Sequence, residues 1–186
     1  LLPEDMKKIK RPIIGYMGTI NSTRLDGELL YQIISQRPDY SFVFTGPEDD
    51  GFRQHRIHSL KNAYFTGQKK VDELPAYITA YDVCINPQMV NDITDGNYPL
   101  KIDEYLAMGK PTVATSTHTM RNIFADHTHL ATNPEEWLSA IDRAVTEADD
   151  KELAKQRIAF AETHSWGHSV KKIYGIIDNF LKEKAT

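Results

Sequence analysis

The stretch from Asn86 to Ser116 constrains the fold of this chain more than any other. It places a helix-sized segment, Leu100–Met108, between two short runs of strand-forming residues, Asp82–Asn86 and Pro111–Thr115. The polar approach to the helix carries an Asp-Gly-Asn turn. A strand, a helix and a second strand in this order are typical of a βαβ unit, in which the two strands are parallel.

The helix in this stretch has clear ends and two different faces. Pro99 stands at its expected first position, where the missing N–H costs nothing, and Gly109 stands where the helix is expected to stop. Lys101 and Glu104 are three residues apart and therefore share one face near the helix start. Another face is expected to pack on the sheet through Ile102, Tyr105 and Leu106. A cation, an acid and the N–H groups of a helix N-terminus together predict a pocket for a nucleotide.

Length, charge and cysteine content exclude several classes of protein. A chain of 186 residues is long enough for one domain with a sizeable core, and its formal net charge of −4 gives no basic surface for nucleic acid. Cys84 is the single cysteine, so a disulfide framework is excluded and a reducing compartment, the cytoplasm, is expected. Cys84 lies in an apolar run and is expected to be a small buried hydrophobe.

Strand-like runs and helix-like segments alternate along the whole chain. The expected strands are Pro12–Met17, Tyr40–Thr45, Asn62–Thr66, Asp82–Asn86, Pro111–Thr115 and His129–Thr132. The expected helices are Leu25–Ile34, Val71–Tyr81, Leu100–Met108, Met120–Asp126, one capped by Asn133, Asp149–Thr163 and His168–Lys184, with a loop or short helix over Glu48–His58. No strand alternates cleanly between polar and apolar residues, so both faces of the sheet are expected to be covered. These features predict a Rossmann-like α/β domain of three layers, with a mainly parallel sheet of about six strands and C-terminal helices.

Ligands of such a sheet bind at the carboxyl ends of its strands. The loops at that edge carry polar and glycine residues: Thr19–Thr23, Pro47–Gly51, Gly67–Lys70, Gln88–Tyr98 and Ser116–Met120. Neither the GxGxxG fingerprint nor the GxxxxGK[ST] phosphate loop occurs, which weighs against NAD and P-loop nucleotides. The histidine pairs His55/His58 and His164/His168 lack the further ligands that a metal site needs, so no metal is expected.

The run PLKIDEYLAMGKPTVAT resembles the nucleotide-sugar-binding half of glycosyltransferases with the two-domain GT-B fold, and is most similar to the large retaining family called group 1 or family 4. The resemblance continues, in the family's order, through IGYMGTINSTRLDGELL, FVFTGP, NAYFTGQKKVDELPAYITAYDVCINP and RIAFAETHSWGHSVKKIYGII. It implies a linker over residues 1–11, a donor-binding domain over 12–148 and a C-terminal helical extension over 149–186. It also implies an N-terminal domain, absent from this sequence, that carries the acceptor site and any membrane contact.

The same resemblance assigns roles to charged residues. Glu104 would accept hydrogen bonds from the ribose hydroxyls, since the two oxygens of a carboxylate suit a pair of O–H donors. Arg24 and Lys101 would hold the diphosphate and are the candidate catalytic residues, because the leaving group gains negative charge as the glycosidic bond breaks. A plain surface role is the alternative for both. Gly96 stands where the family often has a second glutamate, and Asp95 beside it is either its substitute near the sugar or a turn residue.

The remaining donor-binding candidates come from the loops and from the helix start: Gly18, Thr19, Gly67, Gln68, Asn97 and Leu100. Gly18 and Thr19 would let the backbone approach the phosphates, since glycine has no Cβ to obstruct it. Gly67 and Gln68 lie where the family usually contacts the nucleobase, although an ordinary turn is the alternative for both.

The sequence therefore predicts the donor-binding half of a retaining glycosyltransferase. The whole enzyme would transfer a sugar from a nucleotide diphosphate such as UDP to a polysaccharide or cell-surface glycan precursor, without a metal or other cofactor. The fragment alone would bind donor without turnover. Two alternatives stay open: a non-catalytic module that binds a nucleotide or a protein partner through a degenerate site, and half of a nucleotide-sugar epimerase.

Overall fold

Six parallel strands form the centre of the computed structural model, which describes residues 2–92, 94–165 and 167. The strands are β1 (Ile13–Met17), β2 (Ser41–Thr45), β3 (Ala63–Gly67), β4 (Val83–Asn86), β5 (Thr112–Thr115) and β6 (His129–Ala131). Their order across the sheet is β3-β2-β1-β4-β5-β6, and every pairing is parallel. The predicted sheet is confirmed, with strand ends shifted by no more than about one residue.

Helices connect the strands in the order that the sequence predicts. The α-helices are α1 (Gly27–Gln36), α2 (Asp50–Arg53), α3 (Leu74–Ala80), α4 (Leu100–Ala107), α5 (Pro134–Thr146) and α6 (Lys151–Glu162). Short turns of other helix types are η1 (Glu4–Met6), η2 (Arg56–Ser59) and η3 (Met120–Phe124), the last with π-helical hydrogen bonding. The helix expected over His168–Lys184 lies outside the described residues. None of the helices in the described part of the chain has the length and apolarity that a membrane crossing requires.

Four helix starts differ from the sequence prediction. Helix α6 begins at Lys151 and not at Asp149, because the Asp150 side chain accepts hydrogen bonds from the Glu152 and Leu153 N–H groups and so caps the helix there. Pro99 is the N-cap of α4 and not its first residue. Helix α1 begins at Gly27 and not at Leu25, because the Asp26 side chain accepts a hydrogen bond from the Leu29 N–H and so caps the helix there. Helix α3 begins at Leu74 and not at Val71, because Pro75 favours the first turn of a helix.

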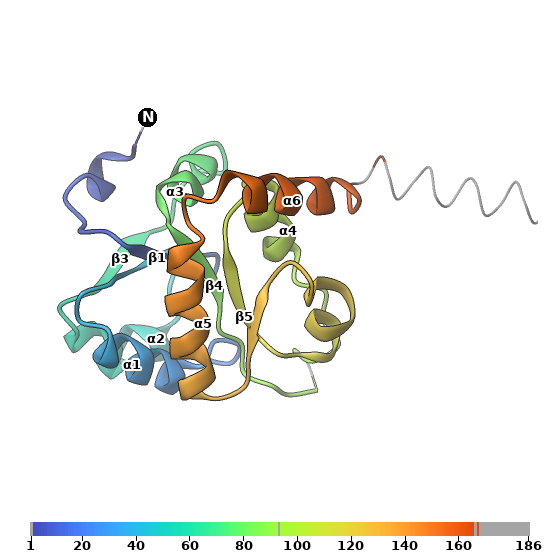
Figure 1. Ribbon diagram of the computed structural model, residues 1–186. Coiled ribbons are helices and arrows are strands. Elements are labelled where there is room, and N and C mark those ends of the chain that lie inside the picture. The colour runs from blue at the N-terminus through green and yellow to red at the C-terminus, as the bar shows by residue number, and fades with distance from the viewer. Residues whose placement is uncertain (1, 93, 166, 168–186) are drawn as a thin grey trace, which may run out of the picture.

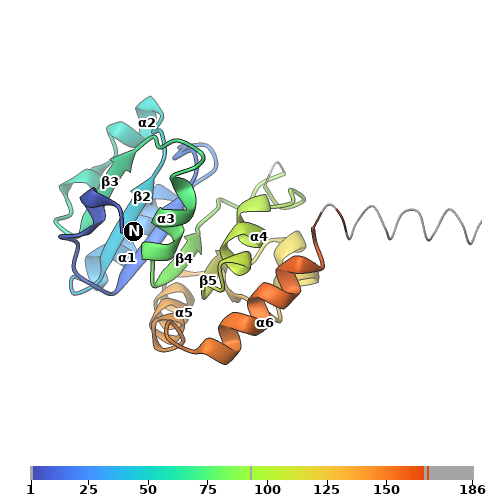
Figure 2. The same ribbon diagram turned by 90° about the horizontal axis from the view of Figure 1, so that it is seen from above.

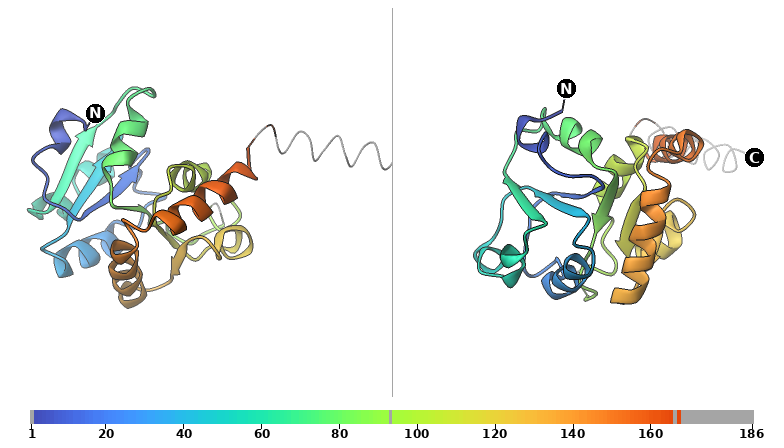
Figure 3. Two further views of the ribbon diagram at one scale, coloured as in Figure 1. Left: turned by 45° about the horizontal axis from the view of Figure 1, so that its top comes forward. Right: turned by 60° about the vertical axis from the view of Figure 1, so that its left-hand side comes forward.

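The helices cover both faces of the sheet and make three layers (Figures 1 and 3). Alternate residues of β1 separate the two cores: Ile14 and Tyr16 pack with α1 and α5, whereas Ile13 and Met17 pack with α3 and α4. Cys84 lies fully buried in the second core, as the sequence predicts. The sheet is thus covered on both sides, which explains its uninterrupted apolar strands.

The segment before β1 is packed against the domain. Met6 is buried in the core beside α3 and α4. The Asp5 carboxylate accepts hydrogen bonds at 2.8 Å from Lys69 Nζ and from the Tyr77 hydroxyl, so η1 lies against the start of α3 (Figure 2). The proposed role of residues 1–11 as a linker stays a prediction.

The strand order changes direction between β1 and β4. Helix α1 follows β1 on one face of the sheet, and α4 follows β4 on the other. Because the two connections leave the sheet in opposite directions, a crevice opens between them at the carboxyl ends of the strands.

Helix α6 crosses α4 and is fixed there by a buried arginine (Figure 2). The Arg157 side chain is 7% exposed, forms an ion pair with Glu147 and donates a hydrogen bond to the Gly109 carbonyl at 3.4 Å. The Gly109 carbonyl belongs to the turn that ends α4, so Arg157 joins α6 to both α5 and α4.

We expect Arg157→Ala to destabilise the fold by about 3 kcal/mol, because Glu147 loses its buried cationic partner and keeps only the His129 ring, at 3.0 Å. Urea unfolding measures this loss. The matched control is Lys155→Ala, since Lys155 lies in the same helix and pairs with Glu152 at 3.6 Å while both side chains are exposed; its expected cost is below about 0.5 kcal/mol. Equal costs for the two variants would show that Arg157 does not hold α6 in place.

Candidate functional site

A cavity of about 850 Å³ opens at the crevice between β1 and β4. Its walls come from the end of β1 and the loop that follows, the end of β2, the loop after β3, Gln88 beyond β4 and the start of α4. The volume is in the range that small-molecule and cofactor sites occupy.

Two glycines let the backbone form one wall of the cavity. Gly18 directly follows β1 with φ 137° and Gly46 directly follows β2 with φ 147°, conformations that other residues rarely adopt. A Cβ on Gly46 would lie 2.0 Å from the Gly18 carbonyl oxygen, and one on Gly18 would lie 2.9 Å from Lys101 Nζ. The strand ends therefore approach each other, and α4, more closely than any larger residue would permit.

The loop that carries Arg24 is held by the segment after β4. The Met89 N–H donates to the Arg24 carbonyl at 2.8 Å, and the Asp26 N–H donates to the Pro87 carbonyl at 3.0 Å. An antiparallel bridge joins Leu25 to Gln88. The two loops on either side of the crevice are thus bonded to each other, which fixes the backbone of Arg24 relative to α4.

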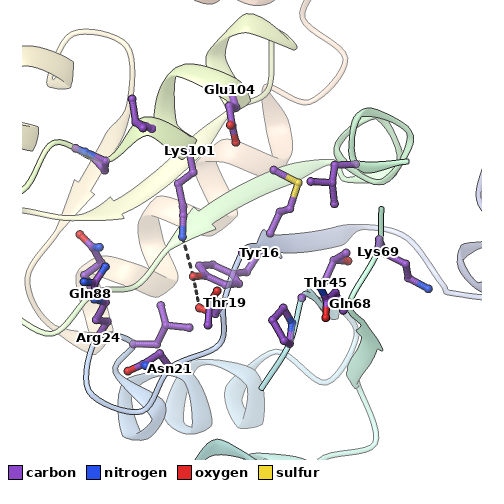
Figure 4. A pocket seen from close by; sticks show the side chains of 18 of the residues that line it. Tyr16, Thr19, Asn21, Arg24, Thr45, Gln68, Lys69, Gln88, Lys101 and Glu104 are labelled. Atoms are coloured by element: carbon purple, nitrogen blue, oxygen red, sulfur yellow. Dashed lines mark hydrogen bonds between the residues drawn. The ribbon is translucent and has the colours of Figure 1, made fainter. Parts of the chain in front are cut away.

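Helix α4 is attached to the end of β1 by two side chains. The buried Tyr105 hydroxyl accepts a hydrogen bond from the Met17 N–H at 2.9 Å. Lys101 Nζ donates to the Tyr16 hydroxyl at 2.7 Å and lies 4.3 Å from the centre of the Tyr16 ring. Figure 4 shows the Lys101 side chain reaching from α4 to Tyr16, with Arg24 to one side of it and Gln68 to the other.

Burial lowers the pKa of Lys101 to about 8; the Glu104 carboxylate opposes this change, and the nearby Arg24 cation adds to it. Lys101 is mostly covered by the protein, whereas Arg24 and Glu104 are exposed. Within the described part of the chain, neither cation forms an ion pair closer than 4 Å with a carboxylate, and the Glu104 carboxylate accepts no hydrogen bond. Helix α4 also begins without a side-chain cap. An anion in the cavity would relieve the repulsion between two cations and meet the N–H groups of the helix start.

The structure brings most of the sequence-predicted site residues to this cavity. Those that line it are Gly18, Thr19, Arg24, Gln68, Asn97, Leu100, Lys101 and Glu104. Gly67 does not line it; its φ is 72°, and its carbonyl accepts a hydrogen bond from the Gly46 N–H at 3.0 Å. Asp95 does not line it either, because its carboxylate accepts from the His118 N–H at 2.7 Å and so attaches the loop to the segment after β5. The roles of all these residues stay predictions.

Six polar residues of the cavity were not singled out as site residues from the sequence: Tyr16, Asn21, Thr45, Lys69, Gln88 and Tyr98. Four of them, Asn21, Lys69, Gln88 and Tyr98, lie in the loops that the sequence places at the ligand-binding edge. Tyr16 and Thr45 read as ordinary members of buried strands, and only the fold shows that they end at the crevice. Gln88 begins the predicted ligand-edge loop after β4, and this position was the signal that could have identified it as a site residue. A group of three or more His, Cys, Asp or Glu side chains arranged for a metal does not occur among residues 2–92, 94–165 and 167.

Comparison with known proteins agrees with the fold. The model of the family described as "Glycosyl transferases group 1" matches residues 11–147. A Bacillus subtilis (strain 168) protein named "Putative teichuronic acid biosynthesis glycosyltransferase TuaH" is 27% identical over 168 residues, which cover 87% of this chain and 42% of that protein.

Solved structures extend the comparison. Sucrose-phosphate synthase from Thermosynechococcus elongatus superposes with a TM-score of 0.72 at 18% identity, over 98% of this chain and 50% of that one. HepE from Anabaena, solved in complex with UDP, gives 0.72 at 14% identity, over 96% and 54%. This chain therefore spans about half the length of the solved relatives and less than half of the Bacillus protein. The chain belongs to the group 1 glycosyltransferases and has the Rossmann-like architecture of one half of their GT-B fold.

Proposed function

We propose that this chain binds the nucleotide-sugar donor of a glycosyltransferase. The observation that carries the proposal is the unbalanced positive charge of the cavity: Arg24 and Lys101 line one crevice beside an uncapped helix start, without a carboxylate ion pair in the described part of the chain. A diphosphate supplies the negative charge that such a site lacks.

Each wall of the cavity suits one part of a nucleotide sugar. The diphosphate lies between Arg24, Lys101 and the backbone at Gly18, where glycine permits close approach. Glu104 lies one turn further along α4 and accepts hydrogen bonds from the ribose hydroxyls. Gln68 is on the opposite side of Lys101 from Arg24, as Figure 4 shows, and contacts the nucleobase. The sugar lies toward Asn97 and Leu100.

The chemistry follows from the same charges. When the glycosidic bond breaks, negative charge grows on the departing diphosphate, and two fixed cations stabilise it more than they stabilise the intact donor. The half of the enzyme outside this chain brings the acceptor, so turnover belongs to the whole protein, and this chain alone binds donor without transferring it. We propose transfer with retention of configuration, without a metal, in the cytoplasm.

The name of the Bacillus relative, which refers to teichuronic acid biosynthesis, supports a polysaccharide or cell-surface glycan precursor as acceptor. The structure of HepE in complex with UDP supports UDP as the nucleotide.

A non-catalytic nucleotide-binding module is the second candidate. Gly96 supplies no carboxylate near the sugar, and the Asp95 carboxylate is engaged by the His118 N–H. The two candidates differ in one outcome: both bind a nucleoside diphosphate, but only the enzyme transfers sugar once both halves are present.

Calorimetric titration with UDP, GDP and ADP tests the proposed function. We expect saturable binding of one of them, about tenfold weaker in Arg24→Ala and in Glu104→Ala, because each change removes a charged hydrogen-bonding partner.

Two control variants keep the same residue types outside the cavity. Arg53→Ala removes an arginine that is 61% exposed and pairs with Asp50, and Glu152→Ala removes an exposed glutamate of α6; both should bind as the unmodified chain does. Failure of all three diphosphates to bind, or an equal loss in the controls, would contradict the assignment of the cavity.

A second prediction concerns the cost of Lys101 to the fold. Below pH 8 both the native and the unfolded chain hold the Lys101 proton, and the native state carries the full penalty of a buried charge. Between about pH 8 and 10.5 the native state loses this proton while the unfolded state keeps it, so the free energy of unfolding rises with pH. Denaturant unfolding from pH 7 to 10 should show the unmodified chain gaining stability relative to Lys101→Met, because other groups with shifted pKa values, such as Lys110 and Cys84, titrate in both proteins and cancel in the difference. Parallel pH profiles would refute it.

A further inference from the structure

A chain of side-chain hydrogen bonds joins the wall of the cavity to the end of α6. Its members are Tyr98, Asp103 and His164, and together they form the relay. The Tyr98 hydroxyl donates a hydrogen bond to one oxygen of the Asp103 carboxylate at 2.6 Å. The other oxygen of Asp103 lies 2.8 Å from Nδ1 of His164, one residue beyond the C-cap of α6. Asp103 therefore bridges a residue that lines the cavity and a residue 61 positions further along the chain.

The surroundings of the relay keep it ordered. The Asp103 side chain is 20% exposed and that of His164 23% exposed. The His164 ring packs edge-on against Phe160 and Phe124, with ring centres 4.6 and 5.7 Å apart, and the Tyr98 ring lies 5.6 Å from that of Phe124. Hydrogen bonds to a carboxylate in such a partly dry setting are stronger than those in water.

The relay holds a segment that has few other anchors. Residues 97–100 join the loop after β4 to the start of α4, and all of them line the cavity. Within the described part of the chain, the bond from Tyr98 to Asp103 is the one side-chain hydrogen bond that this segment makes. The position of Asn97 therefore depends on Tyr98 together with one backbone hydrogen bond, from its own N–H to the Thr94 carbonyl at 3.3 Å.

Asp103 lies in α4 between Lys101 and Glu104 in the sequence but is on a different side of the helix. Lys101 and Glu104 line the cavity, whereas Asp103 points toward α6. The groups assigned to the diphosphate, which are Arg24, Lys101 and the backbone of Gly18, make no hydrogen bond to the relay. A change in the relay should thus move the wall near the sugar and leave the diphosphate site in place.

We propose that Asp103 and His164 are positioning residues of the donor site, which act through Tyr98 to set the wall that receives the donor sugar. This inference rests on the proposed function. Its physical content is that His164, at the end of α6, fixes the orientation of the Asp103 carboxylate. Asp103 in turn fixes Tyr98 and with it the wall of the cavity near the sugar.

Two substitutions of His164 separate hydrogen bonding from packing. His164→Phe keeps an aromatic ring against Phe124 and Phe160 but removes the Nδ1 donor, whereas His164→Asn keeps a donor near the Nδ1 position and removes the ring. Tyr98→Phe removes the hydroxyl alone and, at an exposed position, is expected to fold normally even if a His164 variant does not. The matched control is His127→Phe, since His127 stacks on Phe160 in the same aromatic cluster and makes no hydrogen bond to Asp103.

The measurement is calorimetric titration of each protein with UDP, GDP and ADP and with the glucose conjugate of each. We expect Tyr98→Phe and His164→Phe to weaken binding of the nucleotide-glucose about threefold or more and that of the diphosphate less than twofold. The double variant should be no weaker than the single ones, because both act through one relay. His164→Asn should retain more affinity than His164→Phe, and His127→Phe should bind as the unmodified chain does.

Three results would overturn the inference while leaving the proposed function in place. Unchanged binding by Tyr98→Phe and His164→Phe would show that the relay does not act on the site. Greater retention by His164→Phe than by His164→Asn would assign His164 to packing alone. Equal losses of affinity for the diphosphate and for the nucleotide-glucose would show that the sugar does not contact this wall. Absence of binding by the unmodified chain overturns the proposed function itself, and the inference with it, so the two failures are distinguishable.

Discussion

The change in strand order beside β1 is the constraint on which the rest of the site depends. β1 pairs with β2 on one side and with β4 on the other, so α1 and α4 leave the sheet on opposite faces. The crevice between them is a consequence of topology and needs no side chain to open it. Two glycines, Gly18 and Gly46, then let the strand ends and α4 approach so closely that backbone forms part of the wall. The charged residues are placed by this frame and do not create it.

Charge in the crevice is fixed in advance at a cost to the fold. Lys101 lies against Tyr16 with its pKa lowered by burial, and Arg24 adds a second cation nearby. A chain selected only for stability would place an apolar side chain at position 101. The retention of an ammonium group there fits a site that binds a negatively charged ligand, because fixed charges need not reorganise when the ligand arrives. The loops on either side are bonded to each other between Arg24 and Met89, which preserves this arrangement.

Much of the fold was predictable from the sequence because each helix and strand has a recognisable pattern in its own residues. Short apolar runs between turns predicted the strands, and the spacing of Ile102, Tyr105 and Leu106 predicted the buried face of α4, which the structure confirms. The site was less accessible, since its contacts join distant residues. The bond between Lys101 and Tyr16 spans 85 positions, and no local pattern distinguishes Tyr16 from a core tyrosine. Asp95 shows a second limit: its place beside Gly96 allowed a ligand contact or a turn, and its carboxylate in fact accepts a hydrogen bond from the His118 N–H in the segment after β5.

The central claim is that Lys101, mostly covered by the protein, meets a diphosphate in this crevice. Titration of the nucleoside diphosphate that binds, at pH 8.5 in two buffers of different ionisation enthalpy, tests it most directly. At this pH the phosphates are fully ionised, so an anion that contacts Lys101 must raise its pKa and draw a proton from the buffer. The account predicts uptake of a fraction of a proton on binding, and no uptake in Lys101→Met. Binding with the same heat in both buffers would contradict it, because the diphosphate would then lie away from Lys101.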